Sequence, residues 1–195
     1  VRRQRPHSAP QIHWQEEKRV FTLEKIPVLE LSLSYPQLTG GSQGSEQINH
    51  YYQKLAAAWK SRWSREIYCM AGLDLSRCQA KGQSFHLWAA QLSGSVLFQN
   101  ENLLSIRMDA QEIRGDSRPL LVRTGDIWAL PEGVPLPVQT LFPQIRRRKR
   151  RLFSHLIKQG KARQAAGDCF LDERFDKKLP KALSFQRCAL TPDRL

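Results

Sequence analysis

Residues 28 to 35 read Val28-Leu29-Glu30-Leu31-Ser32-Leu33-Ser34-Tyr35, and in the second half of this stretch apolar and polar side chains alternate. Because successive side chains of a β-strand point to opposite faces of the sheet, a period of two predicts a strand with one buried face. Residues 20–23 read as another strand, and the two strands are expected to meet near Pro27. Pro36 and the glycine-rich residues 39–44 are expected to end the second strand.

A helix is predicted to follow, with Ser45 as its N-cap. Apolar and aromatic side chains recur there every three or four residues, which places them on one side of a helix: Ile48, Tyr52, Leu55, Trp59 and Trp63. We interpret this stripe as core and keep an aromatic ligand platform as the alternative. A second helix is expected after residues 141–143, with apolar side chains from Ile145 to Ile157 and an end at Gly160. A weaker helix is expected over residues 161–178.

Between the two main helices, residues 83–130 carry short alternating runs separated by polar turns, a pattern typical of an antiparallel meander. The proline-rich residues 131–137 are too broken for a central strand, and residues 183–190 read as a last strand. The order of strands, helix, meander, helix and strand predicts the α+β class. We expect a mostly antiparallel sheet with two main helices packed on one face.

The chain has 195 residues, which is enough for one hydrophobic core. We therefore predict a single domain over residues 13–195, preceded by a disordered basic N-terminus at residues 1–12. No apolar run approaches the roughly 18 residues of a membrane-spanning helix, and no signal peptide is visible. As given, the chain is expected to stay in the cytoplasm, or to be extracytoplasmic if a leader was removed.

The net charge of +13 is concentrated in two short segments. Residues 146–163 hold nine Lys or Arg and no Asp or Glu, and Arg2, Arg3 and Arg5 add three cations at the N-terminus. Consecutive cations at a helix start repel one another and oppose the macrodipole, so they form a solvated face or are matched by an anion. The candidate anion-binding or partner-binding residues are Arg146, Arg147, Arg148, Lys149, Arg150 and Arg151.

No catalytic constellation stands out. The five histidines are scattered, so no metal site is predicted, and neither a nucleophile elbow nor a phosphate-binding glycine loop is present. Asp109, Glu112 and Asp116 lie near one hairpin and could supply paired carboxylates, but we favour a solvated hairpin face. Arg114-Gly115-Asp116 matches a cell-adhesion tripeptide, and we treat it as a turn. The prediction is a protein that is not an enzyme and needs no cofactor, with an uncharacterised hydrolase as a remaining alternative.

Four cysteines lack the spacing of a zinc knuckle or a thiol-redox motif. A chain of this size does not need disulfides, so buried free thiols are the expectation. Two untested pairs stay open: Cys69 with Cys78 and Cys169 with Cys188.

The order of several short motifs resembles the RsiV-type bacterial domain family over roughly residues 20–195. The motifs are at residues 31–38, 48–52, 128–136, 141–143 and 190–195. That family includes the extracytoplasmic domain of a lysozyme-recognising anti-sigma factor and the N-terminal domain of a peptidoglycan deacetylase. The resemblance implies an α+β fold and a binding or sensing role with a protein ligand, and it names no ligand for this chain.

Two departures from the family pattern matter. Residues 112–117 replace a Thr-Gly-Gly-Ala-His-like segment of the family, and the net charge of +13 would oppose encounter with lysozyme, which is itself basic. In the family, the turn matching residues 191–194 leads into one more strand. We therefore expect this chain to lack its last C-terminal strand, so that residues 183–190 form an unpaired edge open to self-association. The alternative is an ordinary edge strand. Nucleic acid, bound through residues 146–151, is the second candidate ligand, and membrane insertion is not expected.

Overall fold

The computed structural model of the chain describes residues 9–40, 43–182 and 188–192. Two compact units make up the chain: unit 1 holds residues 1–135 and 189–195, and unit 2 holds residues 136–188. Gln11 and Ile12 were expected in a disordered start, but they begin strand β1. Their expected disorder is wrong because both residues pair with the end of β2, at Thr39 and Leu38.

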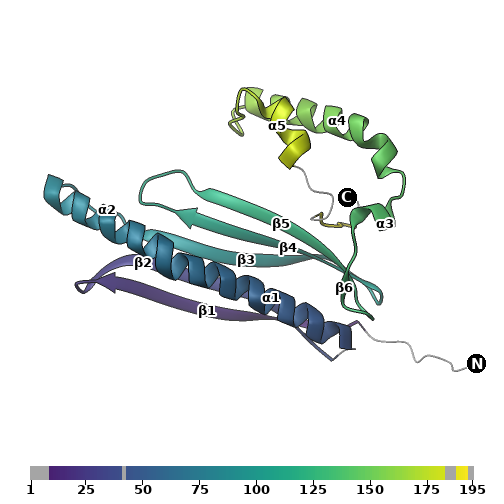
Figure 1. The fold of residues 1–195 in the computed structure, drawn as a ribbon, viewed down its shortest axis with the longest axis horizontal. Helices are drawn as coiled ribbons and strands as arrows, with labels where there is room; N and C mark the ends of the chain where they lie inside the picture. Colours follow the sequence, from purple (N-terminus) through teal and green to yellow (C-terminus); the bar gives the residue numbers. More distant parts are fainter. Residues whose placement is uncertain (1–8, 41–42, 183–187, 193–195) are drawn as a thin grey trace, which may run out of the picture. The chain divides into compact units, whose positions relative to one another are not determined.

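Unit 1 is a six-stranded sheet with one helical layer, shown in purple to green in Figure 1. The strands lie side by side in chain order. Every neighbouring pair is antiparallel except β2 and β3, so the predicted α+β class with a mostly antiparallel sheet is confirmed. The strands are β1 (Gln11–Leu23), β2 (Ile26–Thr39), β3 (Trp88–Gln99), β4 (Leu103–Ile113), β5 (Leu120–Ala129) and β6 (Val134–Pro135).

Strand β2 carries the alternation that the sequence shows. Leu29, Leu31 and Leu33 are buried beneath the helical layer, and the strand turns back on β1 through Glu24 and Lys25, which both have a positive φ. Such a two-residue turn matches the twist of a hairpin. The expected end of the strand at Pro36 is wrong. The strand runs on to Thr39, because its pairing with β3 stops at Leu33 and a proline beyond that point removes no bond from this ladder.

A long helical segment connects β2 to β3 and covers one face of the sheet. It consists of α1 (Gln43–Arg62), a π-helical turn η1 (Trp63–Ile67) and α2 (Tyr68–Lys81). A crossover of this kind is what parallel neighbours such as β2 and β3 require. The predicted stripe is confirmed as core, with Ile48, Tyr52 and Trp63 fully buried. Leu55 and Trp59 pack against the core from its margin.

The π-helical turn has a visible cause in the sequence. Trp63, Ile67, Ala71 and Leu75 are all buried, although they are spaced by four residues throughout. In a regular α-helix, residues four apart drift around the axis, whereas the wider π-turn absorbs part of the drift and keeps them over the sheet. The helix ends at Gly82, whose left-handed backbone and bond from Gln83 N to the Cys78 carbonyl at 2.9 Å close its last turn.

Unit 2 contains α3 (Val138–Leu141), α4 (Ile145–Ala165) and α5 (Phe175–Ala182). The expected end of the second helix at Gly160 is wrong, because α4 continues for five further residues. Gly160 is closely packed in the helix, since an added Cβ would lie 3.0 Å from the Phe175 ring and the ring would have to shift. The weaker helix expected over residues 161–178 is replaced by the end of α4, a loop and α5. Packing of α4 on the sheet stays a prediction.

Residues 183–187 of the expected last strand lie outside the described residues. Residues 188–190 are not a strand. Leu190 instead donates its backbone N–H to Oγ of the fully buried Ser105 at 2.8 Å, on the face of β4 opposite the helical layer. Among the described residues, no helix combines the length and apolar character needed to cross a membrane.

Candidate functional site

The six cations predicted as a binding site all lie in the first third of α4. The side chains of Arg147, Arg148, Lys149, Arg150 and Arg151 are exposed to solvent. Within the described residues, no ion pair to a carboxylate involves the four arginines. The expectation of an exposed basic segment therefore holds for residues 147–151, and its binding role remains open.

Lys149 differs from its neighbours. Its ammonium lies 5.4 Å from the centre of the Phe153 ring, at the distance of a cation–π contact. Phe153 is buried with 8% of its surface exposed, so this lysine lies over the apolar side of α4.

The remaining cations continue along one side of α4. Because an α-helix turns about 100° per residue, five cations fall within an arc of about 100°: Arg147, Arg150, Arg151, Lys158 and Lys161. All five side chains are exposed. We call these five residues the basic stripe. Its length from Arg147 to Lys161 is about 21 Å, from a rise of 1.5 Å per residue.

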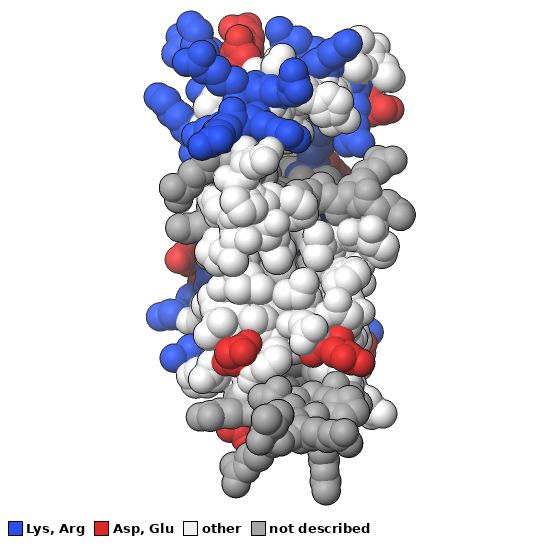
Figure 2. All heavy atoms as spheres, turned by 90° about the vertical axis from the view of Figure 1, so that its right-hand side faces the viewer, with Lys and Arg blue, Asp and Glu red and all other residues white. Residues whose placement is uncertain are grey.

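Unit 2 carries most of the charge of the protein. Its sequence has fourteen Lys and Arg against four Asp and Glu, a net +10 of the total +13. Figure 2 shows Lys and Arg side chains gathered over the helices of this unit. The first turn of α4 has no acidic residue, so the positive end of its macrodipole adds to the cations.

The apolar side of α4 is covered within unit 2. Phe175 of α5 and Leu171 lie against Gly160, at 3.0 and 3.3 Å from an added Cβ. Leu152, Leu156 and Ile157 are half-buried. The helix therefore exposes its charged side to solvent more fully than its apolar side.

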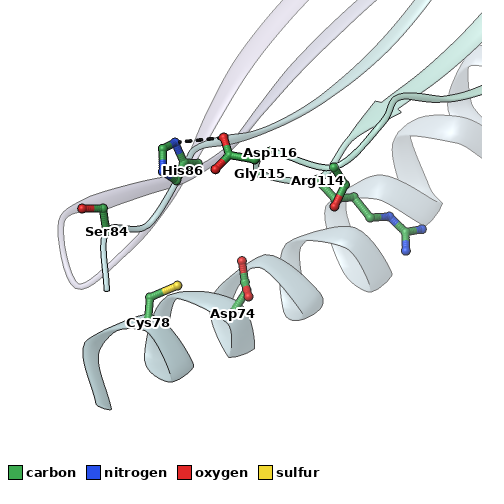
Figure 3. Close-up of a pocket in the computed structure, with 8 residues that line it drawn as sticks. Asp74, Cys78, Ser84, His86, Arg114, Gly115 and Asp116 are labelled. Atoms are coloured by element: carbon green, nitrogen blue, oxygen red, sulfur yellow. Dashed lines mark ion pairs between the residues drawn. The ribbon is translucent and has the colours of Figure 1, made fainter. Parts of the chain in front are cut away.

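Unit 1 has a separate polar pocket of about 370 Å³ where α2 faces the β4–β5 turn (Figure 3). Asp74 and Cys78, one helical turn apart on α2, lie across from the turn. Nδ1 of His86 is 3.2 Å from Oδ1 of Asp116. The pocket contains both signs of charge, and its two carboxyl groups come from different elements, Asp74 from α2 and Asp116 from the β4–β5 turn. The lining residues are Asp74, Cys78, Ser84, His86, Arg114, Gly115, Asp116 and Ser117.

The tripeptide Arg114-Gly115-Asp116 forms a turn, as predicted. Ser117 N donates to the Arg114 carbonyl at 3.0 Å and Gly115 has a positive φ. The Arg114 guanidinium points away from Asp116, toward the helix, and donates to Glu112 at 2.8 Å. It also lies 5.8 Å from the Trp88 ring centre. An adhesion ligand needs both charged groups free, so this geometry does not fit that use.

The carboxylates of the hairpin do not form a catalytic pair. Glu112 lies on the face of β4 beneath the helical layer, whereas Asp109 lies on the opposite face, because an odd separation in a strand reverses the side. The preferred interpretation as a solvated face is wrong for both, since each is mostly buried in an ion pair. Only Asp116 is exposed, at the turn.

Glu112 is held by three donors: Trp63 Nε1 at 3.0 Å, Arg62 at 3.1 Å and Arg114 at 2.8 Å. Burial raises the pKa of Glu112, but the bonds from Arg114 and Trp63 and the charges of Arg62 and Arg114 outweigh it, so the pKa is lowered overall. Arg123 donates two hydrogen bonds of 2.8 Å to Asp109, and these lower the pKa of Asp109. Both carboxyl groups are therefore ionised at neutral pH.

The cysteine predictions have mixed outcomes. Cys69, Cys78 and Cys169 are free thiols, so neither suggested pair is a disulfide. Their expected burial is wrong, because Cys69 is exposed and the others are half-buried. Burial raises the pKa of the Cys188 thiol. In the part of the chain that the structure describes, no three His, Cys, Asp or Glu side chains are grouped as a metal site requires.

Sequence reasoning did not find the polar pocket, because its residues come from α2, the loop before β3 and the β4–β5 turn. The spacing of Asp74 and Cys78 by four residues was the one signal in the chain. Sequence reasoning also missed the far end of the basic stripe, since Lys161 lies beyond the helix end expected at Gly160.

No family model and no curated protein matches the chain. The crystal structure of a DUF3298 family member from Bacteroides fragilis NCTC 9343 is similar to it, with a TM-score of 0.54 and 13% identity over 69% of this chain and 62% of that one. A DUF3298 family protein from Pseudomonas aeruginosa PAO1 matches with a TM-score of 0.41 and 11% identity, over 68% of this chain and 56% of that one. The chain thus spans less than two thirds of either protein. The first likeness shows that the chain shares the fold of that protein.

Proposed function

We propose that the chain is a non-enzymatic binding module of the RsiV type. Two observations support the proposal. The order of motifs from residues 31–38 to 190–195 resembles that family, and the fold is similar to that of a protein of the DUF3298 family, which is related to the RsiV-type domain.

The state of the carboxyl groups supports a non-enzymatic role. A general acid at neutral pH needs a raised pKa, and a general base needs a free lone pair directed at the substrate. Arginines lower the pKa of both Asp109 and Glu112 and occupy their oxygens. Glu112 joins the sheet to the helical layer and Asp109 joins β4 to β5, which are structural uses.

We infer that the ligand is a polyanion held by the basic stripe. The observation that carries this inference is the exposure of Arg147, Arg150 and Arg151 on one side of α4 with no carboxylate paired to them in the described chain. Such a set of cations repels itself when empty, and a polyanion relieves the repulsion.

A protein ligand is the second candidate, and the fold likeness to the DUF3298 protein favours it, because the related RsiV-type domain includes a lysozyme receptor. The two candidates differ in their response to charge. A polyanion should depend on the basic stripe and on salt, whereas a protein ligand held by apolar contacts should survive high salt.

The test is the binding of long-chain inorganic polyphosphate by fluorescence anisotropy at 50 mM salt. The stripe variant Arg147→Gln, Arg151→Gln, Lys158→Gln is compared with a control variant, Lys54→Gln, Lys81→Gln, Arg118→Gln. The control removes the same three charges at exposed positions of unit 1. We expect the wild type and the control to bind and the stripe variant to lose most of its affinity. Absence of binding by the wild type, or equal loss in both variants, would show that the stripe is not a polyanion site.

A further inference from the structure

Resting on the proposed polyanion function, we propose that the polyanion is the phosphate backbone of double-stranded nucleic acid. The basic stripe is straight, because it follows one side of a single helix of 21 residues. Over an axial length of about 21 Å a duplex carries about twelve phosphates, at one charge per about 1.7 Å, which is more than the five cations of the stripe. The backbone of α4 holds its cations in a fixed array, and a duplex holds its phosphates on a rigid helical path, so contact between them orders neither backbone.

A lipid surface shares the anionic chemistry but needs a different helix. Helices that lie in a membrane surface insert their apolar side between the lipids. In α4 that side is covered: Phe153 is buried, and Phe175 packs against Gly160. Charge alone is then left to bind lipid headgroups, which favours a partner with a higher linear charge density. A nucleic-acid duplex has one charge per about 1.7 Å of its axis.

A single strand is disfavoured because its binding sites use aromatic side chains on which bases stack. The one Phe, Tyr or Trp of α4 is Phe153, and its ring is buried beneath Lys149. Phe170 is 81% exposed in the α4–α5 loop, where it lies beside both signs of charge, Asp172 and Glu173 as well as Arg174 and Lys178. Neither Phe170 nor Phe142, which precedes α4 and is 39% exposed, belongs to the basic stripe, so the stripe itself offers a base no ring on which to stack.

The side chains of the stripe also indicate binding without sequence preference. The same side of the helix also carries Ser154 and Ala165, and no Asn or Gln lies within this arc. Asn and Gln are the side chains that read adenine, and the phosphate contacts of Arg and Lys carry no sequence information. We therefore expect duplexes of different sequence to bind equally.

The experiment measures the dissociation constants of the full chain for four probes at 0.1 M salt: a 20-base-pair DNA duplex, one of its strands alone, vesicles with 30% phosphatidylserine, and polyphosphate. At 0.1 M salt, one decade below 1 M, each contact raises the association constant by about 0.9 decades for a duplex and about 0.7 decades for a single strand. Five contacts therefore make the duplex about tenfold tighter than the single strand. The duplex should also bind more tightly than the vesicles. The stripe variant lacks three contacts at about 0.9 decades each, so its affinity for the duplex should fall about 500-fold. The control variant and Phe170→Ala should bind the duplex like the wild type.

Other outcomes separate the two proposals. Binding of polyphosphate with weak or absent binding of the duplex overturns the inference and leaves the proposed function standing. Tighter binding of the vesicles overturns it in favour of a lipid surface. Tighter binding of the single strand, lost in Phe170→Ala, overturns it in favour of base stacking. Failure to bind any probe overturns the proposed function itself.

Discussion

The indole nitrogen of Trp63 donates a hydrogen bond to Oε1 of Glu112 at 3.0 Å and so joins the helical layer to the centre of the sheet. Both side chains are buried, and the carboxylate's other partners are Arg62, the last residue of α1, and Arg114, in the β4–β5 turn. This contact makes the π-helical turn part of the core, because Trp63 is its first residue.

Replacement of Trp63 should be among the costliest single changes in unit 1. Trp63→Ala removes a fully buried ring and one donor to Glu112, and we expect it to lower the free energy of unfolding by about 3 to 5 kcal/mol. Trp59→Ala removes a half-buried ring whose centre lies 5.1 Å from that of Trp63, so this variant should lower the free energy of unfolding by less. Urea unfolding of both variants measures the difference. Equal losses would show that Trp63 is not anchored as described.

Acid should destabilise the chain below about pH 4. The pKa values of Asp109 and Glu112 are lowered in the folded state, so the unfolded chain binds these protons more readily. Their contribution to stability is complete above the unfolded pKa of about 4 and is lost as the pH falls through the folded pKa. Asp109→Asn should therefore flatten the plot of stability against pH in this range. Glu101→Gln, at an exposed turn, is the matched control and should leave the plot unchanged; a change of the same size in both would contradict the assignment.

The start of α1 depends on a glycine that packs against the β5–β6 turn. A Cβ at Gly44 would overlap backbone atoms of Leu130 and Gly133, which cannot move aside like a side chain. Gly44→Ala should lower the melting temperature markedly. Gly72→Ala, in α2, meets only the end of the Leu23 side chain at 3.3 Å, and alanine favours a helix by up to about 1 kcal/mol over glycine, so this variant should be neutral or stabilising. Thermal unfolding followed by circular dichroism ranks the two, and the reverse order would refute the packing.

Removal of cations from the basic stripe should not affect stability. Arg147 and Arg150 are exposed and repel one another, so Arg147→Ala with Arg150→Ala should leave the melting temperature nearly unchanged. Calorimetry on the double variant checks this. A large fall would mean that the two arginines are packed, and losses of binding in stripe variants would then need a structural explanation.

Local patterns in the sequence predicted much of unit 1. Alternation in β2 and the spacing of Ile48, Tyr52 and Trp63 identified both faces of the core, because each pattern reports one element alone. The parallel pairing of Leu29 with Trp88 joins residues far apart in the chain, and no local pattern encodes it. The expected end of β2 at Pro36 failed for a related reason, since the cost of a proline depends on whether the strand has a neighbour on that side.

The candidate site divides in the same way. The cations from Arg146 to Arg151 are contiguous and could be found from the sequence, and the side chains of residues 147–151 are exposed. Extension of the stripe to Lys161 depended on the true length of α4, which Gly160 concealed because it lies inside the helix, close to the Phe175 ring. The polar pocket could not be predicted, since Asp74, His86 and Asp116 meet only after the helix and the hairpin are placed.

The most direct test of the account is the salt dependence of duplex binding by the wild type, the stripe variant and the control variant. If the five cations of the basic stripe each contact a phosphate, the logarithm of the wild-type association constant should fall with the logarithm of salt concentration with a slope of about −4.5. The stripe variant should have a slope shallower by about 2.7, and the control variant should keep the wild-type slope. Equal slopes for the wild type and the stripe variant would contradict the account, because the duplex would then be bound by some other part of the chain.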